Sequence, residues 1–194
     1  MGSKIFIFDN FYLEPYKLLK YITIHKSFFH KSGVNGSFNG VKFFDKRHKI
    51  PVSNIYKDVY FKLENIVNQK ILYPNEICTN FFKFKDSNFN VCRDYYWYPH
   101  LDEGYTGIIY LNDDCVSTTN LYEPNSNLSV QQIYSRHEHV EPWVSKDMWK
   151  NIFSIKGNFN RLVIFDAKKF WHGMDLSDFF NERWRKNQVI FFQQ

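Results

Sequence analysis

The chain has 194 residues, of which 44% are hydrophobic and 20% aromatic, and it carries a formal net charge of +5 at pH 7. This length suits one domain with a sizeable core, so we expect a single domain over residues 1–194. The charge is mild and forms no basic block, and the sequence has no charged-then-apolar leader and no apolar run of about 18 residues. These features give no indication of nucleic-acid binding, and they argue against a signal peptide and a membrane span.

Three cysteines, Cys78, Cys92 and Cys115, have no paired spacing, which is typical of free thiols in a reducing compartment. We therefore expect a cytoplasmic protein. Lys, Asn, Ile, Phe and Tyr are abundant and have AT-rich codons, a composition typical of AT-rich genomes such as those of many viruses and phages. The sequence leaves the oligomeric state open.

The first 75 residues predict a strand, a helix, a loop and a second helix. Apolar residues at helical spacing, with Pro15 near their start, predict a helix over residues 13–24. A second apolar stripe after Ser53, a candidate N-cap, predicts a helix over residues 53–68. Between them, residues 32–40 are rich in Gly, Ser and Asn and predict a loop or the tip of a hairpin. We expect the two helices to buttress one sheet.

From residue 80 onward, short apolar strands alternate with turn signals. Strands are predicted over residues 95–98, 105–112, 161–165 and 183–192. This rhythm indicates a mainly β fold of the α+β class, a double-stranded β-helix of the jelly-roll, cupin-like kind.

Residues 122–144 interrupt the strands with a long polar stretch, which predicts a functional loop. Within it, His137 and His139 form a His-x-His pair, and a solvated or substrate-facing loop explains them better than a second metal site. Near its end, Trp143 and Trp149 are expected to pack the returning chain against the sheet, with a place in a substrate pocket as the alternative.

Two histidines and one aspartate form a candidate metal site. His100 and Asp102 follow the predicted strand 95–98, and side chains at i and i+2 of an extended chain share one face, so both can bind one ion. His172 follows the predicted strand 161–165. Two imidazoles and one carboxylate on one face of an octahedron leave three positions open, as in non-haem Fe(II) oxygenases. His-x-Asp alone is a weak signal, since solvated strand ends carry the same residues.

The order of the motifs strengthens this interpretation. After His100-x-Asp102 come Ile-Tyr-Leu-Asn at residues 109–112, Asn-Arg-Leu-Val-Ile-Phe-Asp at residues 160–166, Trp-His-Gly at residues 171–173 and a closing strand that carries arginines. This series resembles the Fe(II)/2-oxoglutarate-dependent dioxygenases, particularly their prolyl-hydroxylase-like branch. Ser-Thr-Thr-Asn-Leu-Tyr at residues 117–122 departs from the Gly-Gly-Thr-type turn of many relatives.

The resemblance implies that His100, Asp102 and His172 bind Fe(II). It also implies that the protein hydroxylates a substrate with dioxygen and 2-oxoglutarate, releases succinate and CO2, and uses ascorbate as a reductant. A small-molecule and a peptidyl substrate both stay open, because fold and metal do not fix the substrate. The alternatives are a non-catalytic, cupin-like binding module and an altered scaffold that acts through partners.

The resemblance further implies that an arginine of the closing strand pairs with the far carboxylate of 2-oxoglutarate and that Tyr110 donates a hydrogen bond to it. The distance to the terminal aromatic pair favours Arg185, whereas the Asn-Glu-Arg-Trp start of the strand favours Arg183. Period-2 alternation puts both on one face, together with Asn187 and Val189. A planar guanidinium binds a carboxylate bidentately from either position, and Arg185 is preferred.

Overall fold

The computed structural model describes residues 5–24, 30–38, 41–51, 54–70, 76–85, 95–97, 99–113, 118–125, 143–174 and 185–192. Its elements are, in chain order, β1 (Ile5–Phe8), α1 (Pro15–Ile24), β2 (His30–Phe38), β3 (Val41–Pro51), α2 (Asn54–Val67), β4 (Glu76–Lys85), β5 (Tyr95–Trp97), β6 (Tyr105–Tyr110), β7 (Thr118–Pro124), β8 (Trp143–Ser145), the 3-10 turn η3 (Lys146–Met148), β9 (Trp149–Lys156), β10 (Leu162–Asp166), β11 (Trp171–Met174) and β12 (Arg185–Phe192).

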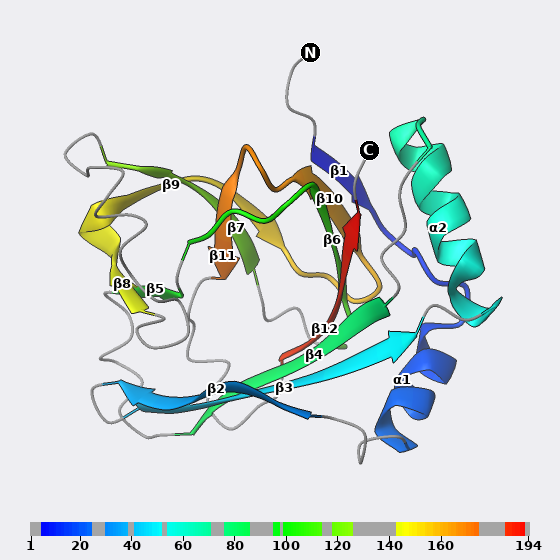
Figure 1. Ribbon diagram of the computed structural model, residues 1–194, viewed down its shortest axis with the longest axis horizontal. Coiled ribbons are helices and arrows are strands. Elements are labelled where there is room, and N and C mark those ends of the chain that lie inside the picture. The colour runs from blue at the N-terminus through cyan, green and yellow to red at the C-terminus, as the bar shows by residue number, and fades with distance from the viewer. Residues whose placement is uncertain are drawn as a thin grey trace.

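Two antiparallel sheets form the body of the protein (Figure 1). The larger has seven strands in the order β1-β10-β6-β12-β4-β3-β2, and the smaller has three in the order β11-β7-β9. Strands β5 and β8 pair separately as a two-stranded ribbon. The predicted double-sheet β fold is therefore confirmed.

The central strands β6 and β10 are buried on both faces, which explains their nearly continuous apolar sequences. Ile108 of β6 lies beside Val163 of β10, and both pack between the two sheets with Leu121 of β7. Their neighbours Ile109 and Leu162 are also paired, but belong to a second cluster on the opposite face of the large sheet. One face of these strands thus meets the small sheet and the other meets the helices.

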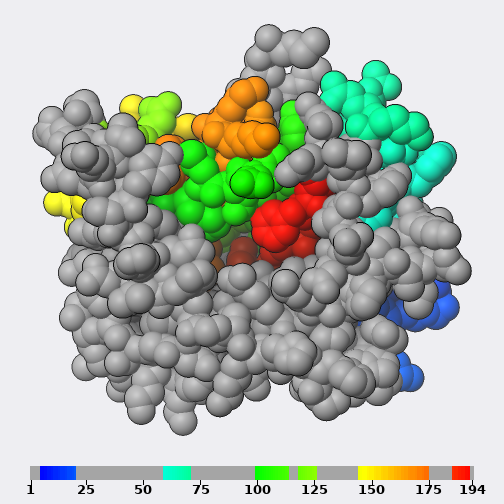
Figure 2. Space-filling model, in the orientation of Figure 1, coloured from blue at the N-terminus to red at the C-terminus, as the bar shows by residue number. Residues whose placement is uncertain are grey.

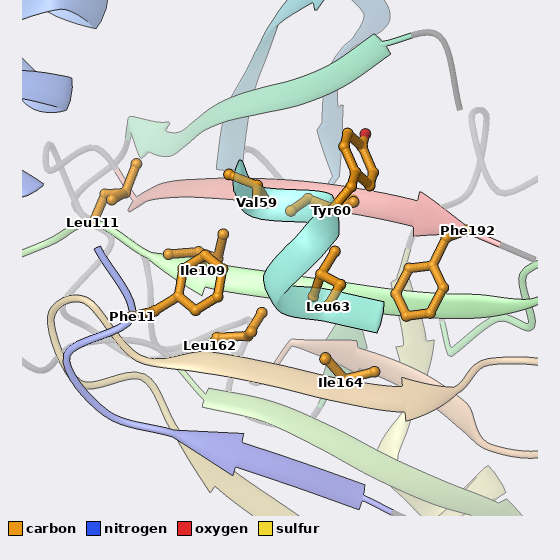
Figure 3. Close-up of a cluster of buried hydrophobic side chains, with 10 residues drawn as sticks. Phe11, Val59, Tyr60, Leu63, Ile109, Leu111, Leu162, Ile164 and Phe192 are labelled. Atoms are coloured by element: carbon orange, nitrogen blue, oxygen red, sulfur yellow. The ribbon is translucent and has the colours of Figure 1, made fainter. Parts of the chain in front are cut away.

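Helix α2 covers the outer face of the large sheet (Figure 3). Val59, Tyr60 and Leu63 project from one side of the helix toward the strands, where they meet residues such as Ile164 and Phe192. Helix α1 adds partly buried leucines to the same cluster. The predicted helices are confirmed to within two residues at each end. Their predicted packing against one sheet is also confirmed. Neither helix is long and apolar enough to cross a membrane.

Asn160 joins the N-terminal segment to the turn before β10. Its backbone has φ 59°, in the left-handed region that Asn tolerates better than most residues. Its side-chain amide accepts a hydrogen bond from Tyr12 N at 2.9 Å and donates one to Tyr12 O at 2.8 Å. Its backbone N–H donates to Tyr110 O at 2.8 Å, and Tyr110 N donates to Arg161 O at 3.1 Å. The end of β6 is therefore fixed from two sides.

One sequence prediction needs correction. Residues 32–38, predicted as a loop or hairpin tip, belong to β2, which pairs with β3 across a register shift between Lys31 and Asn35. Cross-strand pairing with β3, itself paired with β4, overrides the turn propensity of glycine, serine and asparagine here. His172 follows β10, as predicted, and it lies within a further strand, β11, because Trp171 and His172 pair with β7. Of the predicted 122–144 loop, residues 126–142 lie outside the described residues.

The packing of α2 makes a testable prediction about stability. Leu63 is fully buried, so Leu63→Ala should lower the free energy of unfolding by about 2–5 kcal/mol through lost contacts and a residual cavity. Phe61 lies on the same helix but is 65% exposed, so Phe61→Ala should change it by no more than about 0.5 kcal/mol. Urea denaturation measures both values. Equal losses in the two variants would contradict the docking of α2 on the sheet.

Candidate metal centre

His100 and His172 are neighbours in space because their backbones form an antiparallel bridge. His100 N donates to His172 O at 3.0 Å, and His172 N donates to His100 O at 2.9 Å. The bridge docks the segment after β5 on β11, which is itself paired with β7. The two imidazole ring centroids lie 4.4 Å apart. Two residues far apart in the sequence therefore present their rings side by side.

Asp102 is held beside them by the end of β10. Its backbone N–H donates to Ala167 O at 3.1 Å, and Ala167 N donates to Gly104 O at 2.9 Å. Its Oδ2 lies 3.2 Å from His172 Nε2, and its Oδ1 lies 4.0 Å from His100 Nε2. One candidate ligand atom from each of the three residues lies within 4.8 Å of the others.

A backbone carbonyl fixes the proton on the His172 ring. Nδ1 of His172 lies 3.2 Å from Phe170 O, and since a carbonyl only accepts, Nδ1 carries the hydrogen of this bond. In the neutral imidazole, Nε2 then offers a lone pair toward the Asp102 carboxylate 3.2 Å away, whereas in the protonated imidazole Nε2 donates a hydrogen bond to it. A positive charge between them, from a proton or a metal ion, makes this contact favourable.

The Asp102 carboxyl is ionised at neutral pH. Burial raises the pKa of this carboxyl, but a hydrogen bond with His172, the charges of both imidazoles and a hydrogen bond from Thr106 outweigh burial, so its pKa lies below the ordinary value of 3.8. The side chains of His100 and Asp102 stay 30% and 23% exposed, whereas that of His172 is 5% exposed. The cluster is therefore anchored in the protein on one side and open to solvent on the other.

A second cluster lies between the sheets, further along β6. Arg185 of β12 is buried, and its Nη1 donates to Asn187 Oδ1 at 3.2 Å. Its guanidinium carbon lies 5.9 Å from the centre of the Tyr110 ring. The Tyr110 hydroxyl hydrogen-bonds to the hydroxyl of Thr119 on β7. This polar group sits among apolar residues of both sheets.

The two clusters are aligned on one face of one strand. Thr106 contacts Asp102 and Tyr110 contacts the arginine. The two residues are four positions apart along the strand, so their Cα atoms lie about 13 Å apart. In Figure 2 the green segment that contains β6 and the red strand β12 lie side by side, and the surface is hollowed where they meet. One end of this face therefore carries the candidate metal triad, which is partly open to solvent, and the other end carries a buried guanidinium.

Solved structures with the same architecture are 2-oxoglutarate-Fe(II) oxygenases. A prolyl-4-hydroxylase from Pseudomonas putida matches with a TM-score of 0.53 and 8% identity over 100% of this chain and 94% of its own. HygX from Streptomyces hygroscopicus, with nickel and 2-oxoglutarate bound, matches with a TM-score of 0.55 and 10% identity over 98% and 82%. A 2OG-Fe(II) oxygenase family oxidoreductase from Burkholderia pseudomallei matches with a TM-score of 0.50 and 11% identity over 90% and 77%.

The chain has the 2OG-Fe(II) oxygenase fold. No protein-family model matches its sequence, and no curated protein sequence matches it significantly, so the likeness lies in the structure.

The structure describes most of the predicted site residues. His100, Asp102 and His172 come together as one candidate triad, and Arg185 lies beside Tyr110 in the other cluster. Arg183 and residues 136–139 lie outside the described residues. Trp149 is the first residue of β9 in the small sheet, where it is buried and its ring centroid lies 5.1 Å from that of Trp171 of β11.

The sequence analysis did not identify two threonines that hydrogen-bond to the predicted site residues. Thr106 contacts Asp102, and Thr119 contacts Tyr110. Period-2 alternation from Tyr110 back along its strand places Thr106 on the same face, which is a usable signal. No comparable signal singles out Thr119, because its contact crosses between two sheets.

The lowered pKa of Asp102 predicts how the metal-free protein responds to acid. A folded-state pKa below the unfolded value of about 3.9 stabilises the fold above that pH, and this contribution is lost as pH falls through the folded-state pKa. From about pH 5 to about pH 3, the free energy of unfolding should therefore fall more steeply in the wild type than in Asp102→Asn. Denaturant titrations at a series of pH values test this, with Asp113→Asn, an exposed position, as the control. Equal slopes in the wild type and Asp102→Asn would contradict it.

Proposed function

We propose that this protein is a non-haem Fe(II)- and 2-oxoglutarate-dependent dioxygenase, with His100, Asp102 and His172 as its metal ligands and the whole chain as one domain. The observation that carries the proposal is the convergence of two imidazole nitrogens and one carboxylate oxygen within 4.8 Å of one another in an oxygenase fold. This donor set suits non-haem Fe(II) and leaves coordination positions for other ligands.

When bound, iron and 2-oxoglutarate would supply dioxygen activation, with oxidation of 2-oxoglutarate to succinate and CO2 and hydroxylation of a substrate C–H bond. The protein's own part is to hold the ligands in place. The Phe170 carbonyl keeps the hydrogen on Nδ1 of His172, so Nε2 can bind the metal. The ionised Asp102 supplies negative charge without first losing a proton.

Arg185 and Tyr110 are the proposed partners of the far carboxylate of 2-oxoglutarate. The guanidinium is buried between the sheets, where a charge-assisted, bidentate pair with a carboxylate is stronger than in water. The Tyr110 backbone is hydrogen-bonded at both its N–H and its carbonyl, so the backbone position from which the side chain extends is fixed. The structurally similar HygX was solved with nickel and 2-oxoglutarate bound, which supports a site of this kind.

The metal assignment predicts the effect of removing each ligand. His172→Ala, His100→Ala and Asp102→Ala should each abolish stoichiometric binding of Mn(II), used as a redox-stable substitute for Fe(II), because two ligands hold the ion far less tightly than three. Isothermal titration calorimetry measures the affinity, and circular dichroism checks that each variant is folded. Asp113→Ala, an exposed carboxylate outside the triad, is the control and should bind like the wild type. Unchanged affinity in His172→Ala would refute the triad.

The cosubstrate assignment predicts both binding and turnover. Arg185→Ala should weaken 2-oxoglutarate binding to the Mn(II)-loaded protein by about 2–5 kcal/mol, because a buried charge-assisted pair is lost. With Fe(II), ascorbate and dioxygen, the wild type should release succinate slowly even without a substrate, and Asp102→Ala should release none. Arg183→Ala is the matched control and should retain both properties.

These variants also distinguish Arg185 from Arg183 as the cosubstrate ligand, and an enzyme from a binding module. If Arg183→Ala loses 2-oxoglutarate and Arg185→Ala does not, the wrong arginine has been assigned. If the wild type releases no more succinate than Asp102→Ala when candidate peptides, nucleotides and amino acids are added, the protein is better explained as a binding module.

A further inference from the structure

We propose that Thr106 is a positioning residue for the metal centre and that its hydroxyl sets the rotation of the Asp102 carboxylate. The inference rests on the proposed function, since it assigns a role toward the same metal ion. Thr106 touches none of the reacting groups itself and acts only through Asp102.

The contact is a partly buried hydrogen bond with one possible direction. Thr106 Oγ1 lies 3.0 Å from Asp102 Oδ2, and an ionised carboxylate only accepts, so the threonine hydroxyl donates. Thr106 is 1% exposed, so its hydroxyl is shielded from competing water. A hydroxyl on a carboxylate is among the stronger hydrogen bonds of proteins, because the acceptor is charged.

The two partners differ in how firmly their backbones are held. Thr106 lies in β6, a central strand, and pairs with Phe165 of β10 and Phe191 of β12. Asp102 lies outside the strands, and the chain turns at Gly104, whose φ of 86° is in the left-handed region. The hydrogen bond therefore ties a loop carboxylate to a rigid strand.

One hydrogen bond constrains both oxygens of the carboxylate. The last torsion of an aspartate side chain has a broad range, so an untethered carboxylate rotates easily. In the structure, Oδ2 receives the Thr106 hydroxyl and faces His172 Nε2 at 3.2 Å, while Oδ1 faces His100 Nε2 at 4.0 Å. Without the hydroxyl, the 23% exposed Asp102 side chain would exchange this orientation for others solvated by water. Binding a metal would then require the carboxylate to be ordered first.

Outer partners of metal ligands typically contribute 10- to 100-fold to metal affinity. Thr106→Val keeps the branched shape of the side chain and removes the hydroxyl, so it should weaken Mn(II) and Co(II) binding by about 10- to 100-fold. Thr106→Ser keeps the hydroxyl and should bind both ions within about threefold of the wild type, since the donor to Asp102 is retained. Thr106→Ala provides a second hydroxyl-free variant if the valine is poorly tolerated.

The experiment is calorimetric titration of each variant with Mn(II), without 2-oxoglutarate, combined with the visible absorption spectrum of bound Co(II). Thr119→Val is the matched control, because Thr119 is equally buried and its hydroxyl contacts Tyr110 rather than a triad residue. It should keep the wild-type affinity and spectrum. The Co(II) spectrum should change in Thr106→Val and return to the wild-type form in Thr106→Ser.

The outcomes separate this inference from the proposed function. If the wild type binds Mn(II) and a folded Thr106→Val or Thr106→Ala binds it equally well, Thr106 does not position Asp102. If Thr106→Ser is as weak as Thr106→Val, the loss comes from packing and the inference is overturned. If the wild type itself binds no metal, the proposed function fails and the inference fails with it.

Discussion

Two backbone hydrogen bonds between His100 and His172 hold the candidate metal centre together. They join the segment after β5 to β11, and β11 is in turn fixed to the small sheet by its pairing with β7. The packing of Trp171 against Trp149 adds a second constraint, because alternate residues of β11 point to opposite sides of the sheet. His172 can therefore face the other triad residues while its neighbour anchors the strand.

The two faces of the central strands differ in composition: one is packed against helix α2, and the other carries the polar residues of the candidate site. Toward the helices, apolar residues of β6, β10 and β12 pack against α2, and this cluster supplies stability. Toward the small sheet, the same strands carry Thr106, Tyr110 and Arg185 among apolar neighbours, so the polar groups are few and each has a definite partner. A rigid, buried strand thus places the two ends of the site at a fixed separation.

Much of this arrangement could be predicted from the sequence. Alternating and continuous apolar strands identified the double-sheet fold, and helical spacing identified both helices, because these patterns depend only on burial. His-x-Asp alone was a weak signal, and the triad residues were found because the order of the motifs that follow it resembles that of a known family. The strand character of residues 32–38 was missed because glycine, serine and asparagine signal turns locally, whereas strand pairing there depends on distant partners. Thr106 and Thr119 were missed because their importance comes from contacts that only the folded chain creates.

The most direct test of the central claim is a crystal structure of the protein with Mn(II) and 2-oxoglutarate under anaerobic conditions. We expect one ion bound by His100, Asp102 and His172, with 2-oxoglutarate on the same ion and its far carboxylate paired with Arg185. An ion bound by other residues, or a far carboxylate turned away from Arg185, would contradict it.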